Sequence, residues 1–241
     1  MNVISREAII YMKLFFRDRQ AVFWSFLFPT LLLILFCTIL GGTPERSTAL
    51  VAGLLCLNVM SGSLFGTGVV LVGAREQGIL RRYKIAPVAL YKIIIGICIS
   101  RLIAIFLTTA LTILLARLLF KIFFPSNWAA MGIFFVVGVM MFSALSFAIA
   151  ALSNTVSQAN GVVQTLFMLM TFLSGATFPS ELLPSWMQRA ASFLPASYYV
   201  SGMKNIMAMG GGISQNFPAL IWMGLFTFIA GALAIRFFRW E

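Results

Sequence analysis

Apolar residues follow one another along this chain in long runs that short polar segments separate. Six runs are long enough to cross a bilayer, because about 20 mainly apolar residues at 1.5 Å rise each cover roughly 30 Å of hydrocarbon. They lie at 21–40, 49–72, 90–119, 129–152, 159–178 and 218–235. The pattern therefore predicts an all-α membrane protein with six transmembrane helices in a single domain over residues 1–241.

Residues 3–20 precede the first run and have the pattern of a helix that lies flat at the lipid headgroups. Their polar side chains Arg6, Lys13 and Arg17 are seven and four residues apart, so at about 100° per residue they share one face. Apolar side chains fall on or near the other side: Ile4, Ile9, Met12 and Phe16. This interfacial helix is either a basic anchor in contact with membrane lipids or a lever that reaches a cytoplasmic partner.

The connection between the second and third runs, residues 73–92, carries five of the 17 Lys and Arg residues. Pro87 should end any helix before it, since the residue preceding a proline avoids the α region. We therefore predict a short helix over 74–86. Its apolar side chains, Ile79, Leu80 and Tyr83, form a knob among charges, which suits insertion into a groove of a partner protein. A solvated loop is the alternative.

The segment between the fifth and sixth runs is too polar and too often broken by proline to span the membrane. Its prolines and aromatic residues predict two short helices at the outer interface, within 179–209, because Trp and Tyr favour that depth. They form either a lid over the outer end of a pathway or an ordinary interfacial loop.

Composition and charge agree with a membrane protein. Hydrophobic residues make up 61% of the chain and charged residues 10%, which leaves too few polar side chains to cover a soluble domain. With the N-terminus inside, eleven of the 17 Lys and Arg residues fall on the cytoplasmic side and five outside, so both termini are predicted to be cytoplasmic. The net charge of +11 then indicates loops that face an anionic membrane, with no nucleic acid as partner. Arg101 remains inside the third run, as a functional group or as a side chain that reaches back to the headgroups.

The chemistry of catalysis is largely absent from this sequence. The chain has no His, its three Cys are far apart, and none of its six acidic residues falls inside a predicted span. This weighs against an intramembrane enzyme and against proton or sodium coupling, and it predicts no metal and no directly bound cofactor. No phosphate-binding loop G-x-x-x-x-G-K-[ST] occurs either, so this chain is not expected to hydrolyse ATP by itself.

The three segments outside the spans, in this order, resemble the permease subunit of the type-2 ATP-binding-cassette (ABC) exporter family. The cytoplasmic segment is similar to the family pattern E-x-G-x-L-x-R followed by a proline, carried by Glu76, Gly78, Leu80, Arg82 and Pro87. The outer segment is similar to S-G-x-x-x-P followed by P-x-W and L-P, carried by Ser174, Gly175, Pro179, Pro184, Trp186, Leu194 and Pro195. The resemblance covers essentially the whole chain.

The resemblance implies a role for each segment. The cytoplasmic helix would couple to the ATPase through Arg75, Glu76, Gly78, Ile79, Leu80, Arg81, Arg82 and Tyr83. Glu76 would bond to the N-terminal helix, which acts as a lever with Arg6, Lys13 and Arg17. The outer helices would be re-entrant, with a gate at Pro179, Trp186 and Pro195. The pathway would follow the second and fifth spans, with candidate residues Asn58, Ser61, Phe65, Gln164, Phe167, Met168 and Phe172. Contacts between helices or with lipid are the other interpretation of these side chains.

As a member of that family, the chain would be an export permease of the bacterial inner membrane. It would pair with a second permease copy or a homologue and with two ATPase subunits that bind ATP and Mg. Its substrate would be a hydrophobic or amphipathic drug, lipid or glycolipid. The alternative is a membrane anchor or assembly protein that docks a cytoplasmic partner without transport.

Overall fold

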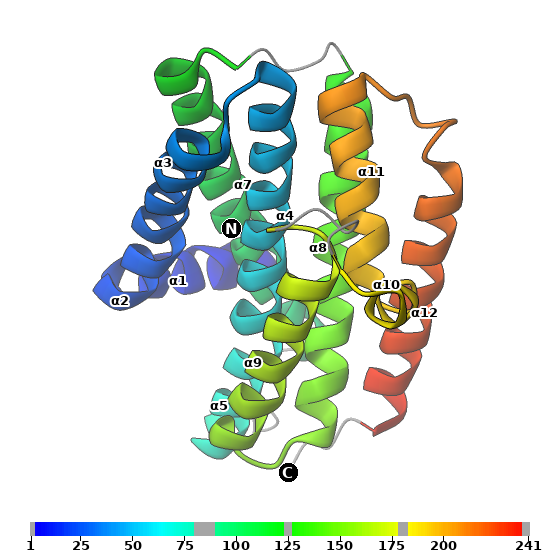
Figure 1. Ribbon diagram of the computed structural model, residues 1–241. Coiled ribbons are helices and arrows are strands. Elements are labelled where there is room, and N and C mark those ends of the chain that lie inside the picture. Colours follow the sequence, from blue (N-terminus) through cyan, green and yellow to red (C-terminus); the bar gives the residue numbers. More distant parts are fainter. Residues whose placement is uncertain (1–2, 80–89, 123–126, 178–182, 238–241) are drawn as a thin grey trace.

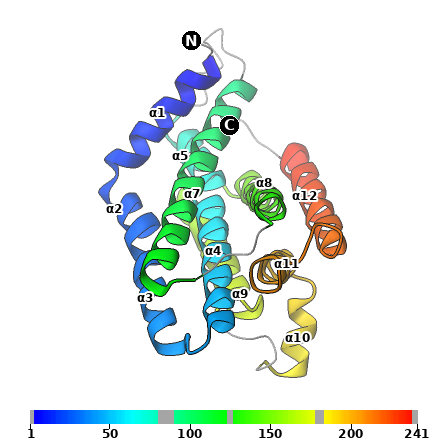
Figure 2. The same cartoon turned by 90° about the horizontal axis from the view of Figure 1, so that it is seen from above.

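The computed structural model describes residues 3–79, 90–122, 127–177 and 183–237, and within these ranges the chain is helical with no strand. Long helices run side by side as a bundle, and α1 (Val3–Arg17) lies crosswise to them (Figure 1). Seen from above, α1 runs along the strongly tilted α7 (Leu90–Phe120), with which it packs (Figure 2).

Five helices within the described residues are long and apolar enough to cross a membrane. They confirm the second to sixth predicted runs: Glu45–Glu76, Ile94–Phe120, Trp128–Leu152 (α8), Val156–Leu173 (α9) and Phe217–Phe237 (α12). The second of the predicted spans consists of two helices, α4 (Pro44–Gly66) and α5 (Gly68–Glu76), with a break at Thr67.

The first predicted span is not one regular helix. It consists of α2 (Arg19–Val22), a π-helical turn (Phe23–Leu27) and α3 (Phe28–Leu40), and its apolar helical stretch, Ser25–Ile39, is shorter than the other five. Pro29 explains the wide turn, because proline has no N–H to donate to the preceding turn of helix. A count of six spans therefore stays a prediction.

The fifth span is shorter than predicted. Helix α9 ends at Leu173, and Gly175 follows with φ +78°, a left-handed conformation that turns the chain out of the helix. The predicted end of the span, Phe178, lies outside the described residues. After it come the two helices expected from the proline spacing, α10 (Ser185–Ala191) and α11 (Pro195–Met209).

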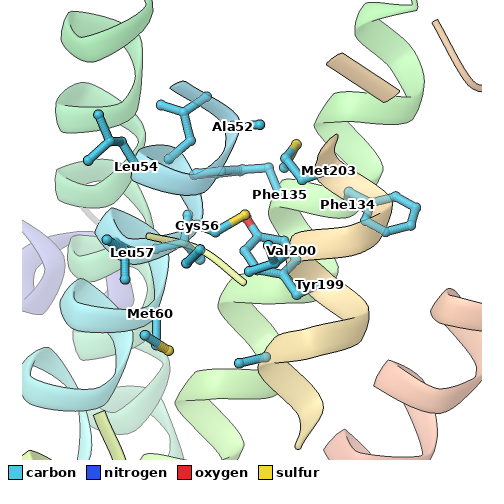
Figure 3. Close-up of a cluster of buried hydrophobic side chains, with 14 of the residues drawn as sticks. Ala52, Leu54, Cys56, Leu57, Met60, Phe134, Phe135, Tyr199, Val200 and Met203 are labelled. Atoms are coloured by element: carbon cyan, nitrogen blue, oxygen red, sulfur yellow. The ribbon is translucent and has the colours of Figure 1, made fainter. Parts of the chain in front are cut away.

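Helix α11 is part of the core, so the interpretation of this segment as an ordinary interfacial loop is wrong for residues 195–209. Tyr199, Met203 and Ile206 of α11 are at most 1% exposed. They pack with the continuously buried stretch of α4 and with Phe134 of α8 (Figure 3). At Gly53 the backbone of α4 comes so close to the chain after α9 that a Cβ would collide with the carbonyl oxygen of Ala176. The core thus forms around α4, between α7, α8 and α11.

Candidate functional site

The end of α5 carries the first residues of the predicted coupling segment. Arg75 and Glu76 form the last turn of α5, the helix ends at Gln77, and Gly78 turns the chain with φ +70°. The prediction that a separate helix begins at residue 74 is wrong, because residues 74–76 continue the helix that comes out of the membrane-crossing run. The other residues predicted for coupling, apart from Ile79, lie outside the described residues: Leu80, Arg81, Arg82 and Tyr83.

Arg75 and Glu76 both bind the turn between α8 and α9, about 80 residues further along the chain (lower end of Figure 1). The Arg75 guanidinium donates a hydrogen bond to the carbonyl oxygen of Ser153, the residue that ends α8. The Glu76 Oε2 accepts a hydrogen bond from the backbone N–H of Val156, the first residue of α9, at 3.1 Å. The prediction that Glu76 bonds to the N-terminal helix is therefore wrong in this structure.

The charges of this pair match the helix ends that they bind. A cation is favoured at the carbonyl end of a helix and an anion at its amide end, where unsatisfied backbone groups give partial charges. Arg75 meets the carbonyl end of α8, and Glu76 meets the amide end of α9. We call this arrangement the Arg75–Glu76 clamp. It ties the C-terminal end of the second span to the ends of the fourth and fifth spans.

The turn that the clamp binds is ordered by its own side chains. Thr155 caps α9, because its Oγ1 accepts from the backbone N–H of Gln158 at 3.2 Å. The Gln158 Oε1 in turn accepts from the backbone N–H of Asn154 at 2.9 Å. This is a variant of the capping box, and the spacing T-x-x-Q was available in the sequence as a signal for the start of α9.

The N-terminal helix lies against α7 through its small and aromatic residues. Ala8 and Phe15 are buried, while the three basic residues predicted to share a polar face are exposed: Arg6, Lys13 and Arg17. The guanidinium of Arg101 on α7 lies 5.4 Å from the centre of the Phe15 ring, and its side chain packs against the backbone of α4 at Gly66. Arg101 therefore joins α1, α7 and α4 at the level of the break in the second span.

The candidate pathway residues of the second span point in two directions. Asn58 is buried, and its Nδ2 donates to the Oγ1 of Thr108 on α7 at 2.9 Å, while the hydroxyl of Ser61 donates to the Asn58 carbonyl. Phe65 instead meets Phe167 of α9 edge to face, with ring centres 5.6 Å apart. In this conformation Asn58 joins two helices, and Phe65 is the candidate that brings the second and fifth spans together.

The remaining pathway candidates lie on an exposed face of α9. Gln164, Met168 and Phe172 are four residues apart, so they follow one another along the helix, and all three are exposed. Asn160 and Thr165 are exposed on the same side. A membrane span with polar side chains on an outward face is unusual for a surface that meets only lipid.

The predicted outer gate is divided between the surface and the core. Trp186 on α10 is 65% exposed, Pro195 is buried as the first residue of α11, and Pro179 lies outside the described residues.

Sequence reasoning missed Lys204 of α11, whose Nζ donates to the carbonyl oxygen of Gly175 at 2.5 Å, close to the end of α9. The sequence predicts Tyr199 at the outer interface, but this residue is buried in the core, and its hydroxyl points toward Cys56 (Figure 3).

No group of three or more His, Cys, Asp or Glu side chains gathers within the described ranges to hold a metal ion.

A comparison with protein families identifies the chain. The model of the ABC-2 family of transporter proteins matches residues 45–236, which include all five candidate spans apart from the last residue of α12, Phe237. The chain belongs to the ABC-2 transporter family. This confirms the resemblance carried by the two segments outside the spans, around Glu76 and around Trp186.

Relatives in two bacteria carry permease names. YvfS of Bacillus subtilis (strain 168), named as a transport permease, is 25% identical over 236 residues, which is 95% of this chain and 96% of YvfS. LnrN of the same organism, named as a linearmycin resistance permease protein, is 26% identical over 202 residues, or 81% of this chain. YbhR of Escherichia coli (strain K12), named as a multidrug ABC transporter permease, is 23% identical over 189 residues, or 78% of this chain. The match covers 51% of LnrN and 51% of YbhR.

Family membership and five apolar helices together make this chain a multi-pass membrane subunit of an ABC transporter. Permeases of this family work with ATP-binding subunits. The Arg75–Glu76 clamp lies where the chain leaves the second span, at the start of the segment that the family pattern E-x-G marks.

Proposed function

We propose that this chain is the permease of an exporter that moves a hydrophobic or amphipathic compound out of the cytoplasm. Two separate ABC ATPase subunits hydrolyse ATP with Mg, and a second permease, identical or homologous, completes the pathway. The substrate class is a drug, lipid or glycolipid. The names of LnrN and YbhR, which refer to linearmycin resistance and to multidrug transport, support the drug class.

The observation that carries this proposal is the Arg75–Glu76 clamp. The segment that follows it, residues 77–86, docks into the ATPase through Ile79, Leu80 and Tyr83 among the basic residues Arg81 and Arg82. Movement of the ATPase pulls on the end of α5. Because Arg75 and Glu76 bind the end of α8 and the start of α9, the same movement is transmitted directly to the ends of the fourth and fifth spans.

The exposed polar face of α9 supports a paired permease. Asn160, Gln164 and Thr165 are exposed on a span, and polar side chains in hydrocarbon are stabilised when they meet polar groups of another helix. This face meets the second permease, and the pathway runs between the two copies. Met168 and Phe172 continue the face with flexible apolar side chains, which accommodate varied apolar compounds.

The proposed setting is the inner membrane of a bacterium, with six spans and both termini in the cytoplasm. The first span runs through α2, the π-helical turn and α3, whose combined helical path from Arg19 to Leu40 has the length that a span needs. The crosswise helix α1 then lies at the cytoplasmic headgroups, with Lys13 and Arg17 exposed toward them.

The test compares substitutions of Glu76 in the complex that co-purifies with the tagged chain in proteoliposomes. Glu76→Ala removes the acceptor for the Val156 N–H, so we expect drug-stimulated ATP hydrolysis to fall about fivefold or more, while the chain still folds and assembles. Glu76→Gln keeps a side-chain oxygen and should retain most of the stimulation. Glu45→Ala is the matched control, since Glu45 is an exposed carboxylate at the opposite end of the same span.

The alternative, a membrane anchor without transport, predicts a different result. An anchor would bring down a partner without ATPase activity, and Leu80→Asp would release that partner with no effect on any hydrolysis. Stimulation that stays at the wild-type level in Glu76→Ala would contradict the role of the clamp.

A further inference from the structure

The break in the second span is bridged by a side chain from another span. Between α4 and α5, the Gly68 N–H donates to the Oγ of Ser146 on α8 at 2.9 Å, and the same Oγ donates to the Leu64 carbonyl oxygen at 2.6 Å. In a regular α-helix the N–H of residue 68 donates directly to the carbonyl of residue 64. The hydroxyl of Ser146 therefore stands inside the hydrogen-bond ladder of a neighbouring helix.

This site is dry and closely fitted. Ser146 is 1% exposed and Thr67 is completely buried, so the backbone groups at the break have no access to solvent. A Cβ at Gly68 would collide with the backbone carbonyl of Ser146, so only glycine permits this approach of α5 to α8. A second hydroxyl marks the same break, since the Thr67 Oγ1 donates to the Ser63 carbonyl at 2.7 Å, a bond that bends helices.

The two bonds of Ser146 have an alternative that leaves no group unsatisfied. If Ser146 withdraws, the Gly68 N–H can donate to the Leu64 carbonyl, and the Ser146 hydroxyl can donate to the carbonyl of Phe142, four residues earlier on its own helix. Backbone groups inside a membrane protein must be paired, which excludes most rearrangements but permits this exchange. Both arrangements have the same number of hydrogen bonds, so a modest force can decide between them.

The break also lies between two differently attached halves of the span. Below it, α5 packs with α8 and α9 and is held to their ends by the Arg75–Glu76 clamp. Above it, α4 packs with α7, α8 and α11, and Asn58 bonds to Thr108 of α7. A change of angle at residues 64–68 therefore moves the clamped half against the half that forms the core.

We propose that residues 64–68 are a two-state hinge of the second span, and that Ser146 is the positioning residue that sets the balance between its states. The structure holds the open state, with the hydroxyl inserted. The closed state has the direct Gly68–Leu64 bond. The role of the hinge in transport rests on the proposed function, in which a pull on the Arg75–Glu76 clamp opens or closes the hinge. The existence of two hinge states can be measured without transport.

The experiment measures the distance between the two ends of the second span by double electron–electron resonance. Spin labels are placed at Arg46→Cys and Gln77→Cys, both exposed positions, in the full chain with its three native cysteines replaced by alanine. The chain is purified with its co-purifying partners and reconstituted in lipid nanodiscs. It is measured without nucleotide and after trapping with ATP and vanadate.

We expect two distance populations, whose ratio changes on trapping. Ser146→Ala should shift the ratio toward the closed state by roughly three- to tenfold, the effect of one net hydrogen bond. Ser146→Thr keeps the hydroxyl and should resemble the wild type. The matched control is Ser143→Ala, which removes a buried hydroxyl one turn earlier on α8 that takes no part in the Leu64–Gly68 ladder. Thr67→Val should shift the ratio in the same direction as Ser146→Ala, and it keeps the test intact if Ser146→Ala does not fold.

Equal ratios in Ser146→Ala and Ser143→Ala, or in the wild type with and without trapping, would overturn the hinge. If Ser146→Ala shifts the distances but drug-stimulated hydrolysis is unchanged, the role of Ser146 in transport is overturned. If no ATPase co-purifies, the proposed function fails. The comparison of Ser146→Ala with Ser143→Ala in the chain alone then still tests the hinge.

Discussion

The second and fifth spans are both candidates for the transport pathway, yet one is largely buried within the subunit and the other is largely exposed. In its most apolar stretch, the second span (Glu45–Glu76) is 72% buried, whereas the fifth (Val156–Leu173) is 17% buried. The second span is held on several sides, by α7, α8, α11 and the clamp. The fifth is held at its two ends, buries Ala159, Val163 and Met170 along one side, and meets the second through Phe65 and Phe167.

This difference separates the two tasks that a permease subunit must perform. The second span is the element around which the chain folds, so its residues determine whether the subunit is stable and how movement passes through it. The fifth span leaves a polar face uncovered, so in the proposed exporter its residues determine how the subunit contacts the second permease and the substrate. Substitutions in the two spans should therefore have effects of different kinds.

Two glycines give the largest expected contrast. Gly53→Ala places a Cβ against the carbonyl oxygen of Ala176, so we expect it to lower the free energy of unfolding by about 2 kcal/mol, or to prevent folding. Gly161→Ala on α9 has no atom within 4 Å of its Cβ and should stabilise the helix by up to about 1 kcal/mol. Thermal unfolding of the detergent-solubilised chain measures both. A destabilised Gly161→Ala would show that the face of α9 that carries Gly161 is packed within the subunit.

Two polar side chains sharpen the contrast further. Asn58→Leu removes the bond to Thr108 and should destabilise the subunit by about 1 kcal/mol, with little effect on assembly. The Thr108 hydroxyl still donates a hydrogen bond to the carbonyl oxygen of Ile105, so the loss of stability is limited. Gln164→Leu should leave the thermal unfolding of the subunit unchanged and weaken its pairing with the second permease, measured by cross-linking in membranes. The reverse pattern would place the partner surface elsewhere.

The spans were the easiest part to predict, because length and hydropathy decide whether a helix can cross a bilayer. The structure departs from the predicted helices where a single residue changes the backbone. Pro29 opens a π-helical turn inside the first run, and Gly175 ends the fifth helix early. Both residues are visible in the sequence, but their effect on the backbone depends on how the surrounding helices pack against it.

The candidate site shows the same limit at longer range. The sequence predicted the end of the second span at residue 72, whereas the helix continues to Glu76 before the chain turns. The partner of Glu76, the amide of Val156, lies 80 residues away, and no local pattern connects the two. Ser146 was missed for a related reason: a lone serine in an apolar run has many explanations, and its insertion between Leu64 and Gly68 is evident only from three-dimensional packing.

The smallest expected effect concerns the one place along their lengths where the two spans meet through aromatic rings. Phe65 and Phe167 form an edge-to-face pair with ring centres 5.6 Å apart, a geometry worth about 0.5–1.5 kcal/mol beyond simple burial. A double-mutant cycle with Phe65→Leu and Phe167→Leu isolates that term, because Leu keeps most of the apolar surface. In the unliganded subunit we expect a coupling of about 1 kcal/mol in thermal unfolding. If the pathway opens between the spans, this coupling should decrease in the complex trapped with ATP and vanadate. A coupling that stays the same in both states would mean that the second and fifth spans move as one body, and that the pathway opens on the other side of α9.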